Sequence, residues 1–355
     1  MNQMHNSKWK HDRFAPPSRD SQVDRNAVIG RSAGGAGEVF LVTGAAGLLG
    51  GAVVRRLLGA YPTGRIVAVV RGRSVPPRLK KLSSGENTAA RLAIIHGDLS
   101  KPHVWGRLPD TITRVFHLAA RIEHDAEQTR KAEIVRDNLG PIAHLVEWAQ
   151  QAPCLRQVVY ASSVSVYGNT TEMVTESSPP EPANLYAAAK LAGEDLLGVL
   201  TTRGLCATCL RFSSLYGSEM RAATVLPLMI RQARERGEIT VFGSGRRVQD
   251  FLYVDDAAQA ALLACRHAAA GIFNAAAGTS VTMAVLAQTV ANVVAPGRAR
   301  VRIETARPEG SPGYVVDVRK AHHVLGFFPR YDLETGLREM ERQSGVAQPC
   351  VPSLS

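Results

Sequence analysis

The stretch VTGAAGLLG, residues 42–50, joins an apolar run to a run with helical spacing of its apolar residues. EVFLVTG predicts a buried strand, and LLGGAVVRRLLGAY predicts a helix with one apolar face. In such a junction one glycine permits a tight turn, a second lets a diphosphate approach the backbone, and a third lets helix and strand pack closely. The free N–H groups of the first helical turn then bind the phosphates. The predicted dinucleotide-binding positions are Gly44, Gly47, Leu48, Leu49 and Gly50.

Strands and helices alternate from this junction to Gly217. The strands are short and almost wholly apolar, which is typical of strands buried on both faces. Parallel neighbours need crossover helices, so the alternation predicts an α/β fold: a Rossmann doubly wound parallel sheet with a smaller mixed C-terminal substrate-binding lobe. The later strands are predicted at 65–70, 91–98, 112–120, 156–163 and 206–217, and long helices at 132–151 and 184–204.

The alternation weakens after Gly217, which suggests a division of the chain. The predicted parts are a disordered leader at 1–37, a dinucleotide-binding Rossmann core at 38–216, a substrate-binding lobe at 217–249 and 282–342, a return to the core at 250–281, and a tail at 343–355. Within these parts, residues 240–254 predict a hairpin-like pair of strands, and helices are predicted at 225–239, 255–269 and 281–294.

Composition narrows the class of protein. The 355 residues carry a net charge of +11, with 21% charged and 45% hydrophobic residues. The arginines are scattered rather than massed on one helix, so we expect sites for phosphorylated ligands and no nucleic-acid partner. No apolar run reaches the ~20 residues of a membrane span, and the N-terminus lacks an apolar signal region. We therefore expect a cytoplasmic protein with no membrane partner.

Cys206 and Cys209 form a CxxC pair, a spacing that elsewhere serves redox chemistry or metal binding. Here they lie in a predicted strand, where residues three apart point to opposite faces with Cα atoms ~10 Å apart. No second CxxC completes a zinc site. The cysteines are interpreted as reduced packing residues, and no metal is predicted.

Two arginines follow the strand predicted at 65–70. Arg71 lies about twenty residues after Gly50, where an acidic residue would bind the ribose 2′-OH of NAD and an arginine accommodates the 2′-phosphate of NADP. A guanidinium forms bidentate, charge-assisted bonds to phosphate. Arg71, with Arg73 as its helper, therefore favours NADP, with NAD as the alternative. Asp98 is expected at the adenine edge, or else as the N-cap of the next helix.

A second constellation combines Ser163, Tyr186 and Lys190. Tyr186 and Lys190 are four residues apart on a predicted helix and share one face. A tyrosine has a pKa near 10 and is a poor acid–base catalyst at neutral pH unless a cation lowers that pKa. Lys190 can supply this cation and bind the nicotinamide ribose. Ser163, at the end of a predicted strand, would orient the substrate oxygen.

With these motifs the chain resembles the extended short-chain dehydrogenase/reductase superfamily, in its NAD-dependent epimerase/dehydratase-like branch, over residues 39–340. The resemblance rests on TGAAGLLG, GDLS, HLAA, DNLG, SSVSVYG, YAAAK, LRFSSLYG and GSGRRVQDFLYVDD. It implies a catalytic triad of Ser163, Tyr186 and Lys190, hydride transfer at the nicotinamide, and a nucleotide-linked sugar as substrate. It further implies a homodimer and additional site residues: Asp98, Leu99, Ala119 and Ala120 at the dinucleotide and Asn138 behind the lysine, acting through water.

The two residues after Ser163 narrow the branch. Dehydratases of this branch carry an Asp-Glu pair where this chain has Val164 and Ser165, which argues against dehydration. Two reactions remain: an NADPH-dependent reduction of a keto group on a nucleotide-linked sugar, which Arg71 favours, and an NAD-dependent C4 epimerisation. VVRGRSVPPRLKKL also resembles NADPH-dependent thioester and aldehyde reductases. A catalytically inactive dinucleotide sensor is a further alternative, against which the intact Tyr186 and Lys190 argue.

The expected substrate contacts depart from the family pattern. Gln249 replaces a family arginine at the nucleotide diphosphate, and Arg246 or Arg247 is the candidate substitute, or else an exposed turn residue. Arg307 matches a second diphosphate-binding arginine, and Ser214 replaces an asparagine. Ser163, Ser214, Arg247, Gln249 and Arg307 are the predicted substrate-binding residues.

Overall fold

The computed structural model describes residues 37–122, 131–218, 220, 224–306 and 311–343. The predicted leader and tail lie outside the described residues except for Gly37 and Gln343, and so does Arg307. Within the described part, no helix is long and apolar enough to span a membrane.

A seven-stranded sheet organises the fold, in the order β10-β6-β5-β4-β1-β2-β3. Every neighbouring pair in this sheet is parallel. The reversal of order at β1 and β4 is the switch point of a doubly wound fold, where ligands bind beyond the carboxyl ends of the strands. The predicted fold class is confirmed. The strands are β1 (Val39–Thr43), β2 (Arg65–Val70), β3 (Leu92–His96), β4 (Arg114–His117), β5 (Gln157–Ser163), β6 (Cys206–Phe212) and β10 (Gly271–Ala275).

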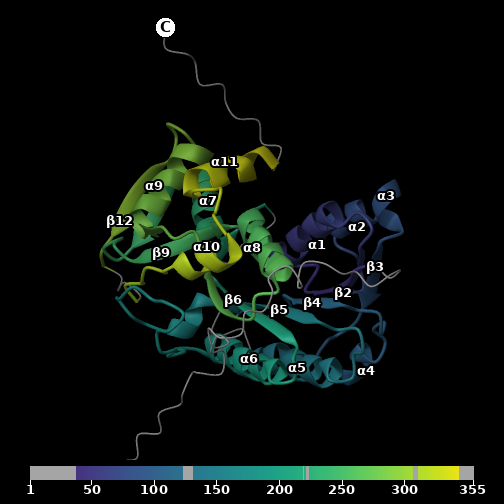
Figure 1. Cartoon of the computed structure of the whole chain (residues 1–355). Helices are drawn as coiled ribbons and strands as arrows, with labels where there is room; N and C mark the ends of the chain where they lie inside the picture. The colour runs from purple at the N-terminus through teal and green to yellow at the C-terminus, as the bar shows by residue number, and fades with distance from the viewer. Residues whose placement is uncertain (1–36, 123–130, 219, 221–223, 307–310, 344–355) are drawn as a thin grey trace, which may run out of the picture.

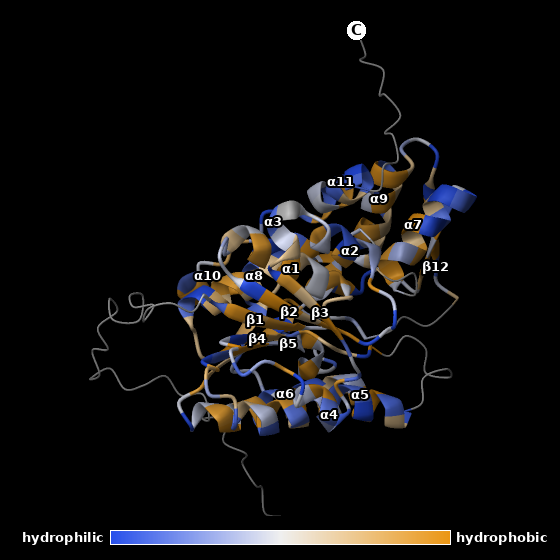
Figure 2. Cartoon of the chain, turned by 90° about the vertical axis from the view of Figure 1, so that its right-hand side faces the viewer, coloured by the Kyte–Doolittle hydropathy of each residue, from blue (hydrophilic) through white to orange (hydrophobic). Residues whose placement is uncertain are grey.

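Helices cover both faces of this sheet (Figures 1 and 2). One face carries α1 (Leu48–Ala60) and α8 (Val254–His267), and the other carries α4 (Pro102–Trp105), α5 (Lys131–Ala149) and α6 (Leu185–Thr201). The central strands are therefore buried on both sides; in β2, for example, every residue after Arg65 is buried. This double burial explains why the strands read as unbroken apolar runs.

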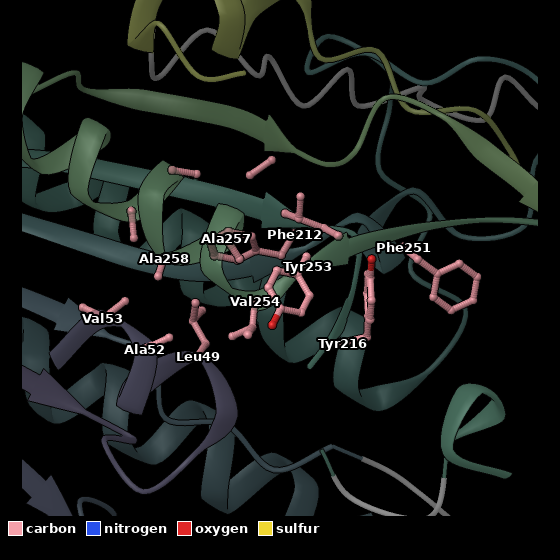
Figure 3. Close-up of a cluster of buried hydrophobic side chains, with 14 of the residues drawn as sticks. Leu49, Ala52, Val53, Phe212, Tyr216, Phe251, Tyr253, Val254, Ala257 and Ala258 are labelled. Atoms are coloured by element: carbon pink, nitrogen blue, oxygen red, sulfur yellow. The ribbon is translucent and has the colours of Figure 1, made fainter. Parts of the chain in front are cut away.

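The packing of α1 against α8 fixes the position of the glycine turn. Small and branched side chains of the two helices meet in one apolar cluster that also includes Phe212 and Tyr253 (Figure 3). Because α8 follows β9 and leads into β10, residues far from the glycine turn in the sequence support the helix that begins there. The labelled residues of α1 and α8 in this cluster are Leu49, Ala52, Val53, Val254, Ala257 and Ala258.

The remaining strands form two small sheets beside α7 (Val225–Arg236), α9 (Met283–Val294) and α11 (Leu333–Gln343). One sheet has the order β11-β9-β7 and the other β12-β8. Short helices complete the fold: α2 (Pro77–Ser83), α3 (Glu86–Ala89) and α10 (Arg319–Leu325). The strands are β7 (Ser214–Tyr216), β8 (Glu238–Phe242), β9 (Val248–Tyr253), β11 (Ser280–Thr282) and β12 (Arg300–Glu304).

The hairpin predicted at 240–254 is wrong. β8 pairs in parallel with β12, whereas β9 pairs with β7 and β11. The connecting loop bonds instead to the start of α9, where Ala284 N donates to Gly245 O at 3.0 Å and Met283 N to Arg247 O at 2.9 Å. With its loop held against α9, β8 and β9 do not pair with each other and belong to different sheets.

The strand predicted at 206–217 divides into β6 and β7 at Ser213, whose N–H donates to Ala275 O of β10 at 3.2 Å. Cys206 and Cys209 lie on β6, so their placement on a strand is confirmed, and both are free cysteines.

Candidate active site

The glycine turn lies at the carboxyl end of β1, with its first glycine at a positive φ of 66°. A Cβ at Gly44 would lie 2.7 Å from Ala119 N, and one at Gly50 would collide with Gly44 O. Gly47 is the N-cap of α1 and offers no side chain to its free N–H groups. The turn is therefore a bare backbone cradle at a helix N-terminus, which fits the diphosphate of a dinucleotide.

Two residues that the sequence analysis missed hold Ala119 beside this turn. Thr43 Oγ1 accepts from Leu118 N at 3.1 Å and from Ala119 N at 3.2 Å, and it lies 3.1 Å from His117 Nδ1. Burial, with a contribution from the nearby Lys190 charge, lowers the pKa of His117 to about 3, so its ring is neutral. The sequence did carry a signal for these two residues, because each is a polar residue at the end of an otherwise apolar strand. Ala120, the next predicted cofactor residue, is exposed.

At the end of β2, Arg71 is already engaged within the protein. Its Nη1 lies 2.8 Å from Asp137 Oδ2, with the arginine side chain 58% exposed and the aspartate 4%. Arg121 and Arg136 also bind Asp137, at 2.9 and 2.8 Å. Burial raises the pKa of Asp137, but the hydrogen bonds from the three arginines outweigh it and hold that pKa below its usual value. Arg73 is exposed.

Asp98 and Leu99 follow β3. Asp98 Oδ1 accepts from Ser100 N at 3.0 Å, while the N-cap of α4 is Lys101, so the interpretation of Asp98 as that N-cap is wrong. Leu99 is buried in the core cluster beneath α4 and α5, and its carbonyl accepts from Trp105 Nε1 at 2.9 Å. The adenine contact of Asp98 and the cofactor contact of Leu99 stay predictions.

Ser163, Tyr186 and Lys190 come together from two elements. Ser163 ends β5, while Tyr186 and Lys190 lie one turn apart on α6, whose N-cap Asn184 accepts from Ala187 N at 2.8 Å. Lys190 Nζ lies 5.7 Å from the centre of the Tyr186 ring and donates to Ala161 O at 2.6 Å. A serine at a strand end, a phenol and an ammonium are the groups that a proton relay beside a carbinol requires.

Without a bound cofactor or substrate, burial is the largest influence on the pKa values of Tyr186 and Lys190. It raises the pKa of Tyr186 to about 12, although a hydrogen bond with Ser163 acts in the opposite direction. Burial also lowers the pKa of Lys190 to about 7, opposed by the negative charge of Glu194. The lowered tyrosine pKa expected from the sequence is therefore not produced by the Tyr–Lys spacing on its own.

A buried ion pair behind the relay was also missed. Glu194 continues the α6 face of Tyr186 and Lys190, and Arg211 of β6 binds it at 2.9 Å through Nε and 2.7 Å through Nη2. Both side chains are 2% exposed. Ser162 donates a short hydrogen bond to the same carboxylate. The sequence offered two signals for this ion pair: an arginine within an apolar strand, and a glutamate eight residues after Tyr186 on the same helix.

Asn138 is buried, and its amide is occupied by backbone groups. Its Nδ2 donates to Arg121 O at 2.9 Å and to Ile134 O at 2.8 Å, while Oδ1 accepts from Arg121 N at 3.0 Å. Asn138 thus holds the segment after β4, whose Ala119 lies against the glycine turn. A water relay from Asn138 to Lys190 stays a prediction.

Of the predicted substrate residues, Ser214 and Gln249 meet. Gln249 Nε2 donates to Ser214 Oγ, because β7 and β9 are paired neighbours. Arg247 lies one residue before β9 and its carbonyl fixes the start of α9. Val164 and Ser165 follow Ser163 in a short 3-10 turn, where Ser165 Oγ donates to Ser163 Oγ at 2.9 Å.

Among the described residues, no group of histidine, cysteine, aspartate and glutamate side chains is arranged to hold a metal ion. The model of the NAD dependent epimerase/dehydratase family matches residues 40–276. The chain belongs to this family. It is an enzyme of the extended short-chain dehydrogenase type, with a cofactor of the NAD(P) class.

Individual relatives agree with this membership. UDP-glucuronate 4-epimerase 1 from Arabidopsis thaliana is 28% identical over 345 residues, covering 91% of this chain and 80% of the relative. A dTDP-glucose 4,6-dehydratase from Streptomyces niveus is 29% identical, covering 84% of this chain and 90% of the relative. The structure of MoeE5 in complex with UDP-glucuronic acid and NAD is 30% identical, with a TM-score of 0.72, and covers 87% of this chain and 100% of that chain.

Proposed function

We propose that this family member is an NAD-dependent C4 epimerase of a nucleotide-linked sugar. The observation that carries the proposal is the pairing of a complete Ser163–Tyr186–Lys190 relay with Val164 and Ser165 in place of an acid and a base. Such a site can move a hydride and a proton at one carbinol carbon. It lacks the two carboxyl groups at these positions that would remove water from a neighbouring carbon.

Ser163, Tyr186 and Lys190 have different roles in the proton transfer. Bound NAD would supply the hydride acceptor and donor for the sugar carbon. Ser163 binds the reacting oxygen, and Tyr186 takes the hydroxyl proton as the carbonyl forms and gives it back on reduction. In its protonated form, Lys190 places positive charge near the phenol, which favours the tyrosinate. Because the hydride returns from the same side, the keto sugar must present its opposite face between the two steps.

The adenosine end supports NAD rather than NADP. The prediction of an NADPH-dependent reductase rested on Arg71. In the structure Arg71 donates to the buried Asp137 and shares that carboxylate with two other arginines. This bond engages one of the five N–H donors of the guanidinium and offsets part of its charge, which weakens the case that the position of Arg71 made for a 2′-phosphate. The epimerase alternative therefore has better support than the reductase, and relatives with 4-epimerase activity by name favour the same choice.

The substrate class is proposed from the relatives. UDP-glucuronic acid is bound by MoeE5, and a UDP-glucuronate 4-epimerase is among the relatives that match most of the chain. We therefore take UDP-hexuronates and UDP-hexoses as the first candidates. The homodimer and the cytoplasmic location stay predictions.

Two measurements on the purified protein test this function. Mass analysis of any retained dinucleotide is expected to find NAD. Incubation with UDP-glucuronate or UDP-glucose, without added reductant, is expected to produce the C4 epimer, and the Tyr186→Phe variant serves as the inactive control. A strict requirement for one NADPH per turnover would contradict epimerisation and restore the reductase. A 4-keto-6-deoxy product would instead indicate dehydration.

A further inference from the structure

A pocket outside the candidate active site is lined mainly by charged side chains. It lies at the parallel pair of β8 and β12 and has a volume of about 550 Å³. In both views β12 lies at the edge of the molecule, away from α1 and its glycine turn (Figures 1 and 2). The charged residues of this arginine pocket are Arg236, Glu238, Arg298, Arg300 and Arg302.

The alternation of β12 places two of these arginines on one face. Residues two apart in a strand point to the same side, and Arg300 and Arg302 lie opposite Glu238 and Thr240 in the parallel register. Glu238 accepts from both arginines, with Oε2 3.2 Å from Arg300 Nε and Oε1 3.1 Å from Arg302 Nε. One carboxylate therefore holds two guanidinium groups side by side.

This arrangement leaves donors for a ligand. Arg300 is 83% exposed, and among the described residues Glu238 is the only carboxylate within ion-pair distance of it. Since that contact is made through Nε, the four N–H donors on its two Nη atoms are directed at no carboxylate of the described chain. Arg302 Nη2 also lies 3.3 Å from Glu304 Oε2, so this arginine is the more fully compensated of the two.

Two further arginines add charge at the same pocket. Arg236 ends α7, and the next residue, Gly237, has a positive φ of 62° and accepts from Arg300 N at 3.1 Å. A Cβ at Gly237 would lie 3.1 Å from Arg298 O, so a glycine there permits the close approach of the two segments. Arg236 and Arg298 are both exposed, and neither has a carboxylate within ion-pair distance among the described residues.

The charge and lining of the pocket select a class of ligand. Even when Glu238 and Glu304 are both counted, the four arginines leave a net charge of +2. Guanidinium groups match the oxygens of phosphate with paired, charge-assisted bonds. The volume is within the range of about 300–1,000 Å³ that is typical of small-molecule sites. No hydrophobic side chain of the described residues lines the pocket, so it offers no surface for a nucleobase or an apolar peptide side chain.

We propose that the arginine pocket binds a compact polyphosphate, either free in solution or as the phosphate chain of a nucleotide. The proposal goes beyond the proposed epimerisation and does not depend on it, because the pocket shares no residue with the glycine turn or with the Ser163–Tyr186–Lys190 relay.

The test is calorimetric titration of the full-length protein with inorganic triphosphate. The double variant Arg298→Ser/Arg300→Ser is expected to raise the dissociation constant about tenfold or more, because it removes two charge-assisted contacts. The matched control Arg65→Ser/Arg203→Ser removes the same charge from exposed positions elsewhere and should change the constant by less than twofold. The melting temperatures of both variants should stay close to that of the unaltered protein, since all four side chains are exposed.

An equal loss of affinity in the two double variants would overturn the proposal, because net charge alone would then explain binding. So would a pocket variant that binds triphosphate as tightly as the unaltered protein, since the ligand would then be bound elsewhere.

Two further ligands define what the pocket recognises. Orthophosphate should bind at least tenfold more weakly than triphosphate, and equal affinity would contradict a site for several phosphate groups. ATP distinguishes the two sources of the phosphate chain. If ATP loses the same affinity in Arg298→Ser/Arg300→Ser, the chain is recognised on a nucleotide as well, whereas a loss confined to inorganic triphosphate assigns the free polyphosphate.

Discussion

The two ends of the proposed dinucleotide site differ in how deeply their charged side chains are buried. At the catalytic end, Lys190, Glu194 and Arg211 are each buried to 2% exposure or less, and the two partners of the ion pair are held by several bonds. At the adenosine end, Arg71 and Arg73 are exposed and Arg78 is half-buried, on a segment of turns and short helices. One end is fixed by buried ion pairs, and the other carries exposed arginine side chains.

This difference in burial leads to different expectations for substitutions at the two ends. Burying a charge carries a desolvation cost and makes it depend on its partners, so changes there should alter stability as well as activity, in either direction. Exposed arginines exchange protein partners for water or ligand at little cost, so changes there should affect binding alone. Single substitutions at the two ends test this separation, beginning with the largest expected effect.

Tyr186→Phe tests the catalytic end most severely. Loss of the proton relay is expected to lower kcat by about 10³-fold or more, since positioned proton transfer contributes 10²–10⁴-fold. Cofactor affinity should change little, because the phenyl ring remains. Steady-state kinetics and dinucleotide titration give both values. Tyr331→Phe, between α10 and α11, is the control and should retain activity. A Tyr186→Phe variant with a tenth of normal turnover would show that another group transfers the proton.

Glu194→Gln tests the buried pair. It leaves the Arg211 guanidinium buried without its carboxylate, and the expected loss in the free energy of unfolding is about 3–5 kcal/mol. Denaturant unfolding measures this loss. Glu334→Gln removes an exposed ion pair with Arg338, in which the side chains are 55% and 51% exposed. That change should cost about 0.5 kcal/mol or less. Similar costs for the two variants would remove the distinction between the regions.

Lys190→Met should stabilise the protein in a pH-dependent way. Burial lowers the pKa of Lys190 from 10.5 to about 7. Between these values the unfolded chain binds a proton that the folded chain does not, so this group makes stability rise with pH through that window. Below pH 7 both states bind the proton, and the full free-energy cost of burying the Lys190 charge is present. Lys190→Met should therefore raise the free energy of unfolding by on the order of 3 kcal/mol at pH 6, and by less at pH 9.

Thermal or denaturant unfolding at the two pH values measures the effect of Lys190→Met, with the exposed Lys80→Met as control. The same gain at pH 6 and pH 9 would mean that charge burial is not its cause.

Arg71→Ala should have the smallest effect. Asp137 keeps two arginine partners, and the ratio of NAD to NADP affinities should change by less than about threefold, or 0.7 kcal/mol. Arg65→Ala, at the exposed start of β2, is the control. A selective tenfold loss of NADP affinity in Arg71→Ala would reverse the preference for NAD.

The same contrast explains how much of the molecule the sequence could predict. β2 has the bounds expected from its apolar run, and the relay follows from the i, i+4 spacing of Tyr186 and Lys190, because both patterns are local. The hairpin at 240–254 failed because β8 finds its partner in β12, about sixty residues later. The pairing of Arg71 with Asp137 was equally inaccessible, since no local pattern tells a long surface side chain which carboxylate it will meet.

Buried polar residues form an intermediate case. Thr43, His117 and Arg211 stand out as polar side chains in apolar strands, which signals that partners must exist. The partners themselves come from neighbouring strands and helices, and only the sheet order identifies them. Gly51 is similar, because this additional glycine is visible in the sequence, but the close approach of the Arg78 side chain that a Cβ there would block is not.

The central claim is that one carbon is oxidised and reduced with no net change of cofactor. The most direct measurement uses UDP-glucuronate, or UDP-glucose, carrying deuterium at C4, with the protein and no added dinucleotide. If the same hydride is removed and returned, the product is the C4 epimer with its deuterium retained at C4. Loss of that deuterium from the product, or turnover only with a stoichiometric supply of NADPH, would contradict it.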